Sequence, residues 1–336
     1  KTEQNQYLRP ILEMADRLGI PYEEWDIDQI RERMPGWDLH RYGPAKALDD
    51  PEFGEPTGDS IHGAVLFPCG GYVDDPQLSV HNLQRAAEAS GAAFRFNSKV
   101  TAILREDGRT AGVELEGGER IAAPVVVNVA GPHSSKVNAM AGLAGTMKIT
   151  TRALRHEVPH VPVGGNYEQT SGIVTSDSDV AAYSRPTAGG SILIGSEDPP
   201  CDGLQWVDPD DFDRNISDRG KAQVMRLAQR MPALGVPNSI PGVVDLYDVT
   251  EDWIPIYDKT DLPGFYVAIG TSGNQYKNAP VAGALMAELI EYCEGGADHD
   301  AEPMPFRMKY TGEEIPVGFF SRNREINPNS SFSVLG

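Results

Sequence analysis

Residues 264–290 read GFYVAIGTSGNQYKNAPVAGALMAELI. An apolar stretch typical of a β-strand, 265–269, is followed by the glycine turn 270–273 and by a helix rich in small residues from 279. Such a strand, turn and helix start form a seat for an anion or a cofactor, because N–H groups at a helix N-terminus point at whatever lies in front of them.

A second stretch has the same character. Residues 125–132, VVVNVAGP, form a continuous apolar run that is typical of a strand buried on both faces and ends in a glycine turn. Two such strand ends side by side are where an open α/β sheet holds its ligand. Either strand alone is compatible with an ordinary strand end. Their combination with GYVDDP, residues 71–76, ahead of a helix is more specific.

The remaining patterns predict two kinds of architecture. Asp26, with Gln29 as its capping-box partner, predicts the start of a short helix. We expect helices over 2–18, 27–34, 76–91 and 208–231. We expect strands over 63–68, 94–96, 99–104, 110–115, 120–122, 151–158, 171–175, 180–185, 191–195 and 243–249. The strands between 147 and 258 suggest an antiparallel sheet with one helix, and thus a second domain that faces a substrate. The fold class expected is α/β plus α+β.

The composition of the chain argues against several classes of function. The chain has 336 residues and a formal net charge of −20, which argues against a nucleic-acid partner. No apolar run approaches the roughly 18 residues of a membrane span. Cys69, Cys201 and Cys293 are scattered and odd in number, which fits a reducing cytoplasm. Because neither they nor the histidines have metal-ligand spacing, we expect no metal site.

Several blocks together resemble a known family. They are residues 70–132, which begin GGYVDDPQLSV, then YSRPTAGGSILIGS at 183–196, DLYDVTEDWIPIYD at 245–258, and 264–290. In this order they resemble the FAD-dependent oxidoreductases of the D-amino-acid oxidase, glycine oxidase and sarcosine oxidase superfamily. The resemblance implies FAD, a Rossmann-like FAD-binding domain beside a mixed or antiparallel substrate domain, and removal of hydride from the carbon next to an amine nitrogen.

The resemblance also implies domain ranges. We expect a helical lead-in of the substrate domain, the middle part of the FAD-binding domain, the substrate domain, the C-terminal strand–turn–helix of the FAD-binding domain, and a tail over the surface. In that order they are 1–60, 61–146, 147–260, 261–295 and 296–336. The family's first segment carries G-x-G-x-x-G for the FAD pyrophosphate, and that motif does not occur here. We therefore expect a further N-terminal segment of roughly a hundred residues, in the same polypeptide or as a separate chain.

Cofactor contacts are carried over from the resemblance residue by residue. Ala130, Gly131 and Pro132 resemble the turn that passes close to the FAD phosphates, where only small residues allow the approach. Val100 matches a strand whose backbone faces the adenine ring. The loop around the flavin ring matches Gly270, Ser272, Gly273, Asn274, Gln275, Tyr276 and Lys277. The helix from 279 would direct its positive end at the pyrimidine side of the flavin.

Three residues are candidates for substrate binding or catalysis. Lys277 matches a lysine that helps bind the substrate carboxylate in sarcosine oxidases, although a surface lysine is the alternative. Tyr183 falls where those relatives have an active-site tyrosine. Arg185 is either a second carboxylate clamp or a structural salt-bridge partner.

Two departures bear on the chemistry. Asp245 stands where sarcosine oxidases have a cysteine bonded to the flavin, so we expect FAD to be held non-covalently. Residues 191–194, SILI, lack the oxygen-activating lysine of the same enzymes. Because such a cation stabilises developing superoxide, a dehydrogenase is open as well as an oxidase.

Two hypotheses of different classes remain. The first is an FAD-dependent oxidoreductase that converts the C–N bond of an amino acid or secondary amine to an imine. The second is a non-catalytic or partner-dependent subunit or fragment of such a flavoenzyme. The missing G-x-G-x-x-G favours the second hypothesis, whereas the intact flavin-loop blocks favour the first. A glycerol-phosphate dehydrogenase of the same superfold is weaker, because 183–195 holds no basic cluster suited to phosphate.

Overall fold

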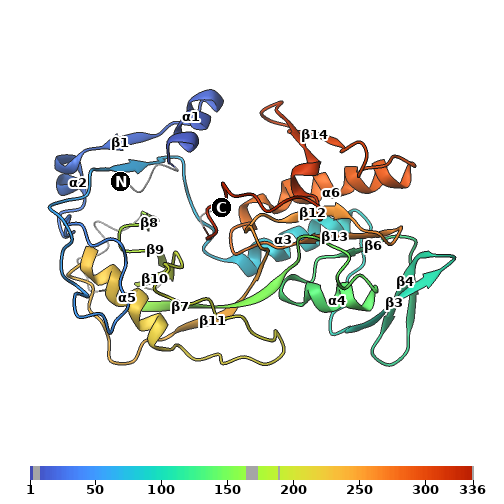
Figure 1. Cartoon of the computed structure of the whole chain (residues 1–336), viewed down its shortest axis with the longest axis horizontal. Coiled ribbons are helices and arrows are strands. Elements are labelled where there is room, and N and C mark those ends of the chain that lie inside the picture. The colour runs from blue at the N-terminus through green and yellow to red at the C-terminus, as the bar shows by residue number, and fades with distance from the viewer. Residues whose placement is uncertain (3–7, 164–172, 188–189, 335–336) are drawn as a thin grey trace. The chain divides into compact units, whose positions relative to one another are not determined.

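The chain packs as two compact units in a computed structural model (Figure 1), which describes residues 1–2, 8–163, 173–187 and 190–334. Unit 1 comprises Lys1–Ala93, Glu157–Leu204 and Asp213–Asp245, and unit 2 comprises Phe94–His156, Gln205–Phe212 and Leu246–Gly336. These units are defined by packing alone, and the domain ranges expected from the sequence remain a prediction.

Unit 1 is built on a five-stranded sheet with the strand order β11-β7-β10-β9-β8. Its strands are β7 Arg152–Pro162, β8 Thr175–Asp177, β9 Ala182–Thr187, β10 Ser191–Ser196 and β11 Gly242–Val249. β7 and β11 start or end outside unit 1, because the chain passes between the units within them. Helix α5, Asp218–Arg230, packs against β9 and β10 (Figure 1). Val224 and Leu227 of this helix share a core with Ile192 and Ile194 of β10.

The N-terminal part of unit 1 has a second, smaller hydrophobic core. Its elements are α1 Leu8–Leu18, β1 Glu23–Trp25, α2 Ile27–Arg33, β2 Ala64–Leu66 and α3 Pro76–Ala89. The predicted capping box at the start of α2 is confirmed, with Asp26 and Gln29 bonded to each other's backbone N–H. Trp25, Ile30 and Ile61 are buried together. Helix α3 differs, because none of its 14 residues is buried.

Unit 2 holds a three-stranded sheet in the order β12-β13-β6. Its strands are β6 Val126–Asn128, β12 Ile256–Lys259 and β13 Phe265–Ile269. A separate antiparallel meander consists of β3 Val100–Glu106, β4 Arg109–Leu115 and β5 Arg120–Ala122. The other elements are α4 Ser134–Met140, α6 Ala279–Glu294, the hairpin of β14 Pro305–Arg307 and β15 Glu314–Pro316, and 3₁₀ turns at Gly131–His133, Tyr276–Asn278 and Val317–Phe320.

The expected helix over 208–231 is wrong in its first ten residues. The helix begins at Asp218, where the Ser217 side chain accepts the backbone N–H of Arg219 and caps it. The acidic run before it is not helical: Asp208 and Asp211 pair in an isolated β-bridge, and Asp208 and Asp210 bind the ammonium of Lys136.

Other expectations also need correction. Residues 94–96 have the aromatic composition of a strand but pair with none. The run at 125–132 yields only three strand residues, and Val129 is 68% exposed rather than buried on both faces. The segment after 296 contributes buried Phe306 and Val317 to a core, so it is more than a surface tail. Residues 3–7 and 171–172, in an expected helix and an expected strand, lie outside the described residues.

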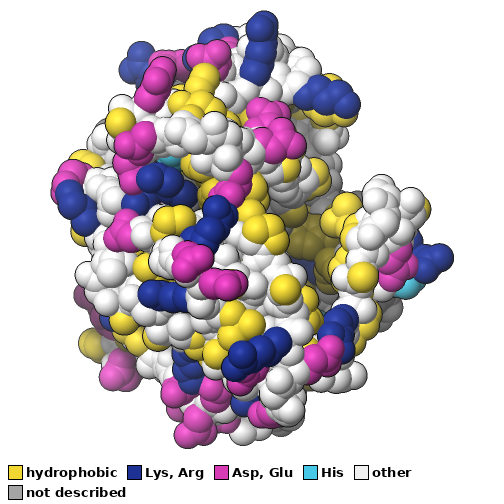
Figure 2. Space-filling view, turned by 90° about the vertical axis from the view of Figure 1, so that its right-hand side faces the viewer, with side chains coloured by type: hydrophobic (Ala, Val, Ile, Leu, Met, Phe, Trp, Pro, Cys, Tyr) yellow, Lys and Arg dark blue, Asp and Glu magenta, His cyan; other side chains and the backbone are white. Residues whose placement is uncertain are grey.

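The surface carries charges of both signs. On the face in Figure 2, lysine and arginine side chains are interspersed with aspartate and glutamate. Among the described residues, no helix combines the length and the hydropathy that crossing a lipid bilayer requires.

Candidate functional site

Two strands of unit 2 end at the same edge of their sheet. β6 and β13 are parallel neighbours, with Phe265 opposite Val126 and Val267 opposite Asn128. Because parallel strands point the same way, the turn at 129–132 and the loop at 270–277 leave from one edge. The structure therefore brings together the two strand ends that the sequence singled out.

The turn after β6 is held by a buried asparagine. The Nδ2 of Asn128 donates to the Ser134 carbonyl at 3.0 Å and to the Asn138 Oδ1 at 2.8 Å, while its Oδ1 accepts the Ala130 N–H at 3.0 Å. Gly131 has a φ of +54°, and a Cβ there would meet nothing within 4 Å. The turn is thus fixed from inside and open on its outer side, which fits the close approach of a phosphate group.

The loop after β13 has three residues in the left-handed region. Gly270, Ser272 and Gly273 have φ values of 76°, 48° and 77°. A Cβ on Gly270 would lie 2.4 Å from the Thr250 Cγ2, and one on Gly273 would lie 2.5 Å from the Tyr247 ring. Both glycines are therefore required by conformation and by space.

Several backbone N–H groups of this loop donate hydrogen bonds to other groups of the chain. Gly270 donates to the Asp248 carboxylate at 2.7 Å, Ser272 to the Asp248 carbonyl at 3.0 Å, and Asn274 to the Thr271 carbonyl at 3.0 Å. These three N–H groups are therefore not available to a ligand. Any contact that Gly270, Ser272 or Asn274 makes with a cofactor must come from other atoms.

The second half of the loop is held by side chains. Gln275 Oε1 accepts from the Tyr257 hydroxyl at 3.3 Å and from the Asn278 amide at 2.8 Å. The Lys277 Nζ donates to the Asn274 carbonyl at 2.7 Å, and partial burial lowers the pKa of Lys277. Tyr276 is 49% exposed. Lys277 is thus tied to the loop by a bond that leaves its positive charge unneutralised.

Tyr183 and Arg185 lie in unit 1, on the sheet face opposite α5. Two residues apart on β9, they share a face, and they pair with Gly195 and Leu193 of β10. Leu193 also pairs with His160 of β7, so His160 belongs to the same face. The alternate residues of β10 point into the core with α5. One sheet face therefore carries a phenol, a guanidinium and an imidazole.

Arg185 brings a positive charge to this face of β9. The Arg185 guanidinium lies 5.0 Å from the centre of the Tyr72 ring and donates weakly to the Pro186 carbonyl at 3.5 Å. Burial lowers the pKa of His160, and the charge of Arg185 lowers it further. His160 is therefore neutral near pH 7. This face suits an anionic group of a ligand.

The remaining candidates also have defined places. Val100 opens β3 in unit 2 and packs against a core that includes Ile103. Sequence reasoning missed Asn128, Asp248 and His160. The signals were weak: one asparagine inside an apolar run, one acid at a strand end, and one histidine on a strand. Among the residues that the structure describes, no cluster of three or more histidine, cysteine or acidic side chains is arranged to hold a metal ion.

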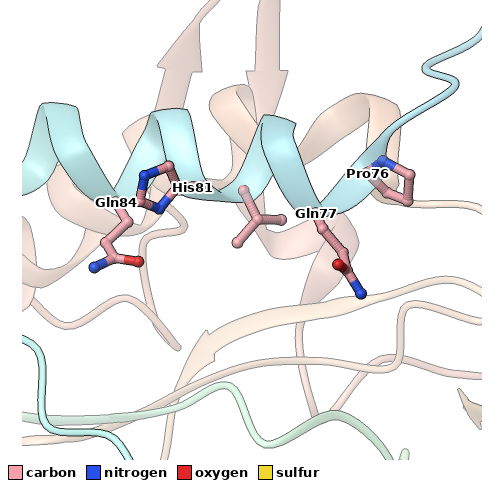
Figure 3. A pocket seen from close by; sticks show the side chains of 5 residues that line it. Pro76, Gln77, His81 and Gln84 are labelled. Carbon is pink, nitrogen blue, oxygen red and sulfur yellow. The ribbon is translucent and has the colours of Figure 1, made fainter.

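A separate pocket of about 390 Å³ borders α3. Pro76, Gln77, His81 and Gln84 project into it from one side of the helix (Figure 3). It contains none of the candidate site residues.

The profile of the family described as FAD dependent oxidoreductase (DAO) matches residues 1–289. The chain belongs to this family. The beta subunit of sarcosine oxidase from Rhizobium meliloti (strain 1021) is 28% identical over 230 residues, which are 68% of this chain and 51% of that protein. Glycine oxidase from Geobacillus kaustophilus (strain HTA426) is 24% identical over 72% of this chain and 59% of the relative. The chain thus spans about half the length of these curated relatives.

Solved structures share the fold. Glycine oxidase from Geobacillus kaustophilus superimposes with a TM-score of 0.67 at 21% identity, over 97% of this chain and 74% of that one. L-proline dehydrogenase from P. horikoshii gives a TM-score of 0.69 at 20% identity, over 96% and 73%. The predictions of this family, of a mixed α/β and α+β fold and of FAD as the family's cofactor are confirmed. The residue roles stay predictions.

Proposed function

We propose that this chain forms the substrate-binding and flavin-contacting part of an enzyme that oxidises the C–N bond of an amino acid or secondary amine to an imine, which water then hydrolyses. The observation that carries the proposal is the sheet face with Tyr183 and Arg185, in a chain of the FAD-dependent oxidoreductase family. Sarcosine, glycine and L-proline in the names of its relatives are all small amines with a carboxylate.

The chain's own residues supply binding and orientation. Arg185 contacts a carbonyl and an aromatic ring, neither of which neutralises it, so its planar guanidinium suits a substrate carboxylate. On the same sheet face, neutral His160 offers a hydrogen-bond partner. In unit 2, the Lys277 ammonium donates to a backbone carbonyl and keeps its charge. When FAD is bound, it accepts the hydride from the carbon next to the amine nitrogen.

A partner-dependent subunit is the second candidate. Two relatives are named as beta subunits of sarcosine oxidase. Within the described residues, β6 is one of the two edge strands of its sheet, and β12 is the other. We propose that a dinucleotide-binding segment with G-x-G-x-x-G, in the same polypeptide or in a separate chain, pairs with the β6 edge and completes the FAD site.

The electron acceptor is a further part of the proposal. The β10 residue that lies between Arg185 and His160 is Leu193, an apolar side chain. No lysine stands in 191–194 to stabilise developing superoxide. We therefore propose a dehydrogenase, or an oxidase that reacts slowly with oxygen.

One experiment tests the reaction class. The protein is titrated with FAD, with a dinucleotide-binding segment supplied where the chain alone takes up no flavin. Anaerobic samples then receive sarcosine, glycine, D-amino acids or L-proline while the flavin absorbance is followed. Bleaching by at least one of these amines, and slow recovery on admission of air, are expected. Flavin uptake without bleaching by any of them would favour the non-catalytic subunit.

Acid precipitation of the FAD-loaded protein tests the linkage. Because Asp245 stands in place of the cysteine, all flavin should leave with the supernatant. Yellow colour in the pellet would show a covalent bond, with the free Cys69 as the first residue to examine.

Lys277→Met tests carboxylate binding. Loss of one charge-assisted hydrogen bond, about 1.5–3 kcal/mol, and of some orientation should lower kcat/KM for a carboxylated amine by about 10- to 1000-fold. Because its pKa is lowered, Lys277 should also lose its charge, and its effect, at a lower pH than an ordinary lysine. Lys99→Met, at an exposed lysine of unit 2, is the control. An equal loss with uncharged amines would instead place Lys277 against the flavin.

A further inference from the structure

Asp248, near the end of β11, is a buried carboxylate that the resemblance to the family did not single out. Only 2% of its surface is exposed. We propose that Asp248 is the positioning residue that holds the loop 270–273 in the shape that receives the flavin. This inference rests on the proposed function, because it assigns a role at the same site.

The contacts of Asp248 cover three consecutive residues of the loop. Its Oδ2 accepts the Gly270 N–H at 2.7 Å, its Oδ1 accepts the Thr271 hydroxyl, and its backbone carbonyl accepts the Ser272 N–H at 3.0 Å. One residue thus fixes the turn at its first, second and third positions.

The loop needs such support because its backbone is strained. Ser272 is fully buried and has a φ of +48°, a conformation that costs a residue with a side chain about 1–2 kcal/mol. The bonds to Asp248 are made at the two residues before this position, Gly270 and Thr271, and at Ser272 itself. They offset the strain and prevent the turn from relaxing.

The residues beside Asp248 complete a template for the loop. The ring of Tyr247 occupies the space beside Gly273, and the methyl group of Thr250 occupies the space beside Gly270. The segment 247–250 therefore sets the path of 270–273 by shape as well as by hydrogen bonds. The bonds are reciprocal, since the loop supplies the donors without which a buried carboxylate is costly.

Hydrogen exchange of the full chain tests the positioning role directly. In Asp248→Ala, the Gly270 amide loses its charged acceptor and should exchange about 10-fold faster or more. The Ser272 amide keeps the backbone carbonyl of residue 248 as its acceptor and should also exchange faster, because the turn then opens more often. Asp248→Asn should fall between, since its amide keeps one acceptor oxygen. The control is Asp258→Asn, at a fully buried carboxylate of β12 in the same unit that binds Arg322 instead.

FAD affinity, measured by flavin fluorescence, tests the link to the cofactor. Asp248→Ala should weaken binding by about 10-fold or more, whereas Asp258→Asn should change it less than about 2-fold even where it lowers global stability. Thr271→Val should weaken binding in the wild type and add nothing in Asp248→Ala, because both remove the same bond.

The outcomes are separable. Unchanged exchange at Gly270 and Ser272 in Asp248→Ala overturns the proposal. Faster exchange with unchanged FAD affinity also overturns it, since the loop shape would then not matter to the flavin. If the wild-type chain takes up no FAD even with a dinucleotide-binding segment supplied, the proposed function fails, and faster exchange would still establish Asp248 as the residue that holds the loop.

Discussion

Gly195 leaves the space on β10 that the ring of Tyr183 occupies. A Cβ at this position would lie 2.0 Å from the Cζ of Tyr183. Gly195→Ala should push the ring aside, cost about 1–3 kcal/mol of unfolding free energy, and raise KM for the amine. Urea denaturation and steady-state kinetics measure the two effects. Gly235→Ala, where a Cβ meets nothing within 4 Å, is the control. Equal behaviour of the two variants would contradict the prediction.

Glu197 is the residue with the clearest pH signature. Burial raises its pKa to about 7, while the Ser176 hydroxyl donates to it. Between its ordinary pKa of 4.5 and about 7, the folded state therefore binds more protons than the unfolded state. This contribution to stability is fully present below pH 4.5 and is lost as the pH rises through about 7.

Glu197→Gln should remove this dependence. The difference in unfolding free energy between wild type and variant should move by about 2–3 kcal/mol, against the wild type, from pH 5 to pH 8. Urea titrations at several pH values measure it, with Glu119→Gln at an exposed position as the control. Parallel curves for wild type and Glu197→Gln would refute the raised pKa.

At the same scale, the sequence predicted the loop but not what holds it. Gly270 and Gly273 are recognisable because glycines after an apolar strand indicate a turn with positive φ. Asp248 is not, because an acid at the end of a strand is usually solvated. Only the path of 270–273 past β11 shows that this carboxylate points inward.

At the scale of elements, features set by residues close in sequence were predicted correctly, whereas features that involve distant residues were not. The capping box of α2 lies within four residues and was predicted from them. The predicted start of α5 is ten residues too early, and the segment in its place contacts Lys136, more than seventy residues away. The polar and proline-rich composition of the C-terminal segment predicts a surface tail, but the segment contains Arg322, which is buried.

Arg322 should be the main anchor of that segment. Its guanidinium binds Asp258 at 3.0 Å, Asp300 at 2.9 Å and Asp261 at 2.7 Å, and Asp258 is fully buried. Arg322→Met leaves a buried carboxylate without its cation and should cost about 3–5 kcal/mol, measured by urea denaturation.

Two further variants test whether the loss in Arg322→Met comes from the buried ion pair. Lys148→Met breaks an exposed pair with Glu325 and should cost at most about 0.5 kcal/mol. Adding Asp258→Asn to Arg322→Met should recover part of the loss, because the unpaired charge is then gone. A loss no larger than that of Lys148→Met would show that the segment is held by apolar packing alone.

At the scale of the molecule, α3 has no buried residue within the described structure, and most of its side chains are exposed. Leu78 and Leu83 are 55% and 54% exposed. Replacing both by serine should change the unfolding free energy of this chain by at most about 0.5 kcal/mol each and lower the fluorescence of a bound apolar dye. Leu227→Ser, at a buried position of α5, should cost about 3 kcal/mol or more. A large loss from the α3 changes would mean that another surface covers this helix in solution.

The interleaved segments of the two units have a consequence for synthesis on the ribosome. Unit 1 needs residues up to Asp245 before its last segment is present, and unit 2 needs the C-terminal segment that carries Arg322. At about 5–20 residues per second, the second stage follows the first by on the order of ten seconds. By the end of that time the apolar strands β6 and β13 of unit 2 have been synthesised, and they are still without their closing segment. We expect the nascent chain to depend on holding chaperones over this interval, and slower translation before residue 322 to increase its aggregation.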